Sequence, residues 1–66
     1  MRNYDRTTDD VDLLALCKTN KDGVALAPRS KDVAALAKKL DPTLRVGAVK
    51  NAIRRLKAEG LIVNPK

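Results

Sequence analysis

Two stretches of the chain carry aliphatic residues at the same helical spacing, and this repeat constrains the fold more than any other feature. Each stretch follows the i, i+3, i+4, i+7 pattern, which places four apolar side chains on one face of a helix. The two sets are Val33, Leu36, Ala37 and Leu40, then Val49, Ala52, Ile53 and Leu56. Between them, Asp41-Pro42-Thr43 stops the first helix, because proline cannot continue the hydrogen-bond ladder. We therefore predict helices over 31–40 and 46–59, packed through these faces.

The residues that flank the pattern predict where the helices begin and end. Ser30 is a favourable N-cap for the helix over 31–40, and Gly60 supplies a left-handed residue after the helix over 46–59. An additional helix is predicted over 8–19, with Thr7 or Thr8 as its cap. The acidic residues of its first turns complement the positive end of the helix dipole; they are Asp9, Asp10 and Asp12.

Two short β-favouring runs complete the predicted fold. Val24-Ala25-Leu26 follows a turn over 20–23 and precedes Pro28, and we expect it to pair with Leu61-Ile62-Val63. The predicted class is mainly α, a three-helix helix-turn-helix core with a minimal two-stranded β element. The domain is expected over 8–64, after a flexible N-terminus over 1–7.

Composition excludes several classes of protein. The 66 residues suffice for one small core, and no apolar run is long enough to span a membrane. The N-terminus lacks the apolar segment of a signal peptide, so we expect a cytoplasmic or nucleoid-associated protein, or a nuclear one if it is eukaryotic. Cys17 is the only cysteine and there is no histidine, so the ordinary zinc ligands and a Cys-His nucleophile are missing. We expect no enzyme, no metal and no cofactor, and interpret Cys17 as a buried small hydrophobe.

Positive charge is concentrated in the second half of the chain. Residues 1–33 carry six basic and six acidic side chains, whereas residues 34–66 carry eight basic and two acidic ones, for a net charge of +6. A field of one sign on half of a small domain is typical of a polyanion binder. Tyr4 is the only aromatic residue, so stacking of single-stranded bases is disfavoured and a duplex is the expected partner.

The second half of the chain contains two characteristic segments: Leu36-Ala37-Lys38-Lys39-Leu40, and then Val49, Ile53 and Leu56 followed by Gly60-Leu61-Ile62. Together these segments resemble the winged-helix group of helix-turn-helix DNA-binding domains. It implies a small transcriptional regulator that binds double-stranded DNA through the helix over 46–59. Two features depart from the pattern. The connection between the last two helices is longer than the usual tight turn. The sequence also ends where a wing hairpin would begin, so the wing is either absent or trimmed from this domain, and the resemblance implies no minor-groove contact by a wing.

A step of 100° per residue indicates which side chains face away from the core on the helix over 46–59. The residues expected to read bases in the major groove are Gly47, Ala48, Lys50, Asn51 and Arg54. The residues expected to contact the DNA backbone are Arg29, Ser30, Lys31, Arg45, Arg55 and Lys57. For Arg55 the alternative is a simple ion pair with Glu59, four residues later.

The apolar residues of the helix over 8–19 cover a wider arc than packing on one neighbour requires. They are Val11, Leu13, Leu14, Leu16 and Cys17. We therefore predict a homodimer through this helix, with Leu13 and Leu16 at the contact. Two alternative functions stay open. The apolar arc of this helix could instead be the docking surface of a protein-protein interaction module. The sequence of the third predicted helix and the following Gly-Leu-Ile also resembles a winged-helix protein of the small ribosomal subunit, which implies RNA or ribosome association.

Overall fold

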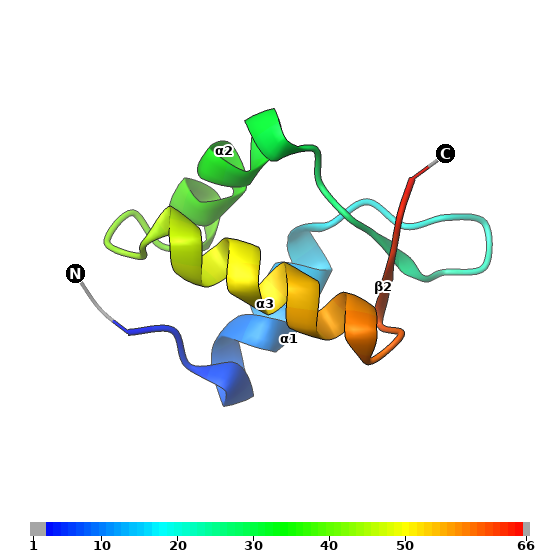
Figure 1. The fold of residues 1–66 in the computed structure, drawn as a ribbon, viewed down its shortest axis with the longest axis horizontal. Helices are drawn as coiled ribbons and strands as arrows, with labels where there is room; N and C mark the ends of the chain where they lie inside the picture. Colours follow the sequence, from blue (N-terminus) through cyan, green and yellow to red (C-terminus); the bar gives the residue numbers. More distant parts are fainter. Residues whose placement is uncertain (1–2, 66) are drawn as a thin grey trace.

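The computed structural model of the chain describes residues 3–65, which form three helices and two short strands (Figure 1). Their order is α1 (Arg6–Leu16), β1 (Ala25–Leu26), α2 (Ser30–Leu40), α3 (Val46–Ala58) and β2 (Ile62–Val63). The prediction of a mainly α fold with a minimal β element is confirmed. Figure 1 shows α3 crossing the front of the molecule, with α1 behind it and α2 above it.

The two periodic helices form most of the core, as their apolar spacing predicts. Seven of the eight patterned side chains are buried, and Leu40 packs against the core while partly exposed. Leu44, in the turn between α2 and α3, is also buried at 6% exposure, a position that the periodicity does not include. Because Leu44 fills the space beside the two helix ends, the long turn contributes to the core and α3 still begins at Val46.

The start of α1 differs from the prediction. The helix begins at Arg6, and its N-cap is Asp5, whose carboxylate accepts hydrogen bonds from the Thr7 N–H at 2.9 Å and the Thr7 hydroxyl at 2.7 Å. The predicted caps, Thr7 and Thr8, are both inside the helix, so that prediction is wrong. A carboxylate two residues before Thr7 reaches the free N–H groups of the first turn better than a hydroxyl already within the helix. The predicted flexible segment over 1–7 is therefore helical at 6–7, and residues 1–2 lie outside the described part of the chain.

The end of α1 and its apolar face are also corrected. The helix stops at Leu16, because Lys18 and Thr19 turn to pair with β1 through the hydrogen bond from Leu26 N–H to Lys18 O (2.7 Å). Leu13 has no exposed surface and is part of the core, so its predicted role in a dimer contact is wrong. Leu16 remains 42% exposed.

The two strands pair as predicted, and they do so in parallel. Ala25 lies opposite Ile62 and Leu26 opposite Val63, with α2 and α3 between them in the sequence. Gly60 has a φ of +80°, the left-handed conformation predicted for it, and turns the chain from α3 into β2. Ile62 points into the core with 1% exposure. The small sheet therefore joins both ends of the α2–α3 pair.

Candidate nucleic-acid interface

The solvent face of α3 carries most of the side chains predicted to read bases. Gly47, Lys50, Asn51 and Arg54 are exposed, and Ala48 is half-buried at the edge of the face. The opposite face is fixed in the core by Val49 and Leu56, at 0% and 1% exposure. The rotation of α3 about its axis is thus set by its buried residues.

All the charged side chains of α3 are basic. Residues Val46–Ala58 include four basic side chains and no carboxylate. Lys50, Arg54 and Lys57 are exposed, whereas Arg55 is half-buried. A helix of 13 residues with this composition presents cations and one amide, Asn51, to any partner that approaches from solvent.

Gly47 occupies a position where the fold itself does not need a glycine. It lies in α3 without a positive φ, and a Cβ built at this position meets no atom within 4 Å. Glycine in a helix costs about 0.5–1 kcal/mol relative to alanine. Its presence on the first turn therefore leaves room for close approach from outside at the expense of helix stability.

The N-termini of α2 and α3 lack side-chain caps, in contrast to α1. Their N-cap residues are Arg29 and Arg45, and neither makes a side-chain capping hydrogen bond. Ser30 is the first residue of α2 rather than its cap, so that prediction is wrong, because the chain enters the helix one residue earlier than the pattern indicated. Neither N-cap side chain occupies the N–H groups of the first turn, and the exposed cations Arg29, Lys31 and Arg45 lie beside them, an arrangement that favours an anion.

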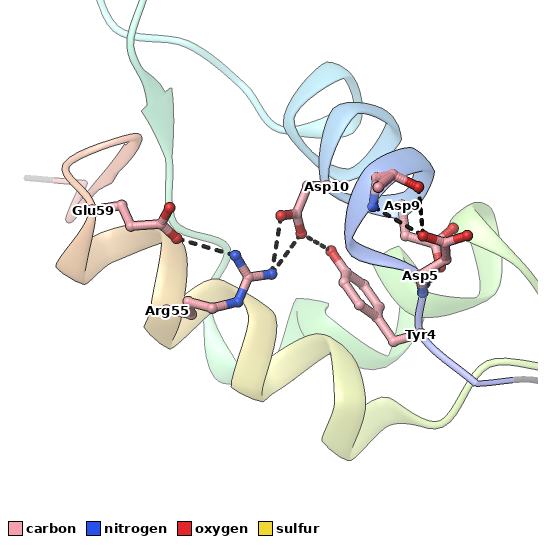
Figure 2. Close-up of polar contacts among 7 residues, drawn as sticks. Tyr4, Asp5, Asp9, Asp10, Arg55 and Glu59 are labelled. Atoms are coloured by element: carbon pink, nitrogen blue, oxygen red, sulfur yellow. Dashed lines mark hydrogen bonds and ion pairs between the residues drawn. The ribbon is translucent and has the colours of Figure 1, made fainter.

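Arg55 is held by two carboxylates, as Figure 2 shows. Its Nη2 donates to both oxygens of Asp10 on α1, at 2.8 and 3.0 Å, and its Nη1 donates to Glu59 Oε2 at 3.0 Å. The hydroxyl of Tyr4 donates to the same Asp10 carboxylate. The predicted pair with Glu59 is present, and Arg55 in addition joins α3 to α1. Its side chain is 25% exposed and that of Asp10 18%.

The pKa values of this cluster follow from its burial and hydrogen bonds. Burial raises the pKa of Asp10, but the hydrogen bonds from Arg55 and Tyr4 more than offset this and leave it below the ordinary value. Burial and the hydrogen bond to Asp10 raise the pKa of Tyr4. Asp10 is therefore charged and Tyr4 is a neutral donor throughout the physiological range.

Sequence reasoning missed this cluster because it joins residues far apart in the chain. Asp10 was interpreted as a partner of the helix dipole, yet it pairs with a residue 45 positions away. Asp9 is buried at 3% exposure and accepts a hydrogen bond from Asp5 N–H at 2.7 Å, so it fixes the start of α1. The single aromatic residue could have served as a signal, since a lone tyrosine in a small protein usually packs on the core.

Cys17, expected to be buried, is only half-buried because it lies at the end of α1 and packs against the edge of the core; this partial burial raises the pKa of its thiol. Within residues 3–65 no three His, Cys, Asp or Glu side chains gather closely enough to hold a metal ion. None of the described helices combines the length and apolar character needed to cross a membrane.

The chain was compared with protein-family profiles, with curated proteins and with solved structures, and none of the three comparisons gave a match.

Proposed function

We propose that this protein binds double-stranded DNA by inserting α3 into the major groove, and that it acts as a transcriptional regulator. The observation that carries the proposal is the solvent face of α3, which combines cations and an amide with a small residue at its start and has no carboxylate. The major groove is about 12 Å wide and admits one helix, and its base edges are read by arginine, lysine and asparagine.

Five residues of the interface have specific roles in this proposal. Arg54 donates to the O6 and N7 atoms of a guanine, and Asn51 forms two hydrogen bonds with an adenine. Gly47 lets the first turn of α3 approach the base pairs closely. Arg29 and Arg45 bind phosphates together with the free N–H groups of α2 and α3, and so set the position of the protein without reading sequence.

Salt dependence of binding tests the proposal. Fluorescence anisotropy of a labelled duplex DNA of random sequence should give a plot of log affinity against log salt with a slope of roughly −4 to −5, if about five phosphates are contacted. A slope near zero, or no binding at 50 mM salt, would refute it. A labelled duplex RNA titrated in parallel distinguishes RNA binding from DNA binding. If the protein binds neither duplex, the alternative of a protein-protein interaction module is favoured.

Base readout is tested by selecting bound sequences from a random DNA pool. The variants Asn51→Ala and Arg54→Ala should lose about 1–3 kcal/mol of discrimination at the base pair each residue reads. Arg29→Ala should weaken binding to all sequences by a similar factor, which makes it the matched control. If the wild-type protein enriches no sequence although it binds DNA, the base-reading role of α3 is wrong.

A further inference from the structure

A shallow cleft of about 430 Å³ separates α3 from the N-terminal segment of the chain. It is lined by Tyr4, Arg6, Ala48, Asn51, Ala52 and Arg55. Two of these residues, Ala48 and Asn51, belong to the proposed base-reading set. The N-terminal segment therefore borders the α3 face directly, although sequence analysis assigned it no part in binding.

Arg6 is an exposed cation of this cleft that contributes little to the stability of the fold. It is exposed and is the first residue of α1, where the positive end of the helix dipole disfavours a cation. An arginine four residues before an acidic partner, here Asp10, is also the less favourable order for a helical ion pair. Among residues 3–65, Arg6 makes no direct ion pair, although its charge helps to lower the pKa of the nearby Asp10 carboxyl.

The nearby carboxylates are engaged within the protein. Asp5 accepts hydrogen bonds from Thr7, and the Asp10 carboxylate is held by Arg55 and Tyr4. None of these carboxylates lines the cleft. Of the polar residues that line the cleft, Arg55 and Tyr4 already donate to carboxylates, so the guanidinium of Arg6 and the amide of Asn51 remain to donate to the oxygens of a phosphodiester.

The place of Arg6 relative to α3 indicates which phosphate it would meet. In Figure 1, α2 lies above α3, whereas the first turn of α1 lies below it. A helix in the major groove has a phosphate strand on each side. The helix α2, whose N-cap is Arg29, therefore lies on one side of α3, and the first turn of α1, which begins with Arg6, lies on the other.

We propose that Arg6, with the cleft between α1 and α3, binds a backbone phosphate of the DNA strand opposite the one contacted by α2. This inference rests on the proposed DNA-binding function and extends the interface to a second element outside the α2–α3 pair. In this proposal the Tyr4–Asp10–Arg55 cluster also serves binding, because it holds α1 against α3 and so keeps Arg6 beside Asn51.

The test compares Arg6→Ala with Lys21→Ala, which removes an exposed cation from the turn at 20–23, outside the proposed interface. Anisotropy titrations with the labelled random duplex are run at several salt concentrations for both variants and the wild type. We expect the salt slope of Arg6→Ala to be smaller in magnitude by about 1, and Arg6→Lys to restore it, while Lys21→Ala keeps the wild-type slope. Thermal melts check that Arg6→Ala remains folded; little change in stability is expected, because the lost attraction to Asp10 opposes the relieved repulsion from the helix dipole.

The outcomes separate the two proposals. If the wild-type protein binds and Arg29→Ala reduces the slope but Arg6→Ala does not, the Arg6 site is wrong and DNA binding through α2 and α3 stands. An equal decrease in the salt slope for Lys21→Ala would also overturn the Arg6 site, since the net charge of the protein would then explain both results. If the wild-type protein binds no duplex, the proposed function itself fails.

Discussion

Single residues in this protein make contacts that their sequence neighbours do not reveal. Tyr4, the only aromatic side chain, connects the N-terminal segment to Asp10, and Asp10 connects α1 to Arg55 on α3. The buried aliphatic positions on α2 and α3 were predictable because helical spacing is a local property, whereas buried Leu44 lies in the turn between the helices and outside that spacing. The charged cluster was not, because pairing between α1 and α3 depends on how the helices pack.

The Asp10 carboxylate should make stability depend on pH. Its pKa is lower in the folded protein than in the unfolded chain, so its contribution is present above about pH 4 and is lost as pH falls through the folded-state value. Replacing Asp10 with Asn should lower the free energy of unfolding at pH 7 by about 1 kcal/mol, the range of a partly exposed ion pair. Melting temperatures between pH 7 and pH 2 should fall less steeply for Asp10→Asn than for the wild type. Parallel curves would show that this pair contributes nothing.

Substitutions at Gly47 should change stability and DNA binding in different ways. Gly47→Ala should raise the free energy of unfolding by about 0.5 kcal/mol, because alanine favours the helix and the space around the position is open. Gly47→Leu should also be at least as stable as the wild type but should weaken DNA binding by at least about tenfold, since the side chain would occupy the space needed by the groove. Urea denaturation and anisotropy on the same samples measure both effects. Unimpaired binding by Gly47→Leu would exclude close approach at this turn.

Among the elements, the middle of each helix was predictable and the ends were less so. The bounds of α2 and α3 were within one residue of prediction, because apolar periodicity and Pro42 or Gly60 define them. The bounds of α1 shifted by two or three residues, since its start depends on the Asp5 cap and its end on pairing with β1. Helix ends respond to tertiary contacts more than helix centres do.

The uncapped start of α2 predicts opposed changes in stability and binding. Arg29→Asp introduces a carboxylate at the N-cap, where it can accept from the free N–H groups, and should stabilise the protein by about 1 kcal/mol. The same carboxylate should repel phosphate and occupy those N–H groups, so DNA binding should fall further than it does for Arg29→Ala. Thermal melts and salt titrations of the two variants check this. A less stable Arg29→Asp protein would mean that the N–H groups already have an acceptor.

The whole molecule depends on the closure of its small sheet. Parallel pairing of Ala25 with Ile62 brings the chain after α3 back to the chain before α2, and Ile62 is almost fully buried. The pairing itself was predictable from two β-favouring runs. That only two residues of each run form a strand was not, because the length of a strand depends on the neighbours available to it.

Neighbouring residues on β2 provide a controlled test of this closure. Ile62→Ala should lower the free energy of unfolding by about 3 kcal/mol, a large part of the stability of so small a domain. Val63→Ala, at a position 37% exposed, should cost less than about 1 kcal/mol. Urea denaturation monitored by circular dichroism compares the two. Equal losses would show that the buried face of β2 does not hold the fold together.

The hydrogen bond from Ala27 N–H to Val63 O (2.8 Å) should report on opening of the whole domain, because of its position in the fold. It connects the residue just after β1 to the end of β2, so it can persist only while both intervening helices keep their places. The amide proton of Ala27 should then exchange with deuterated solvent only when the entire domain opens. A single resonance would thus act as a gauge of global opening, readable in any variant and with or without DNA.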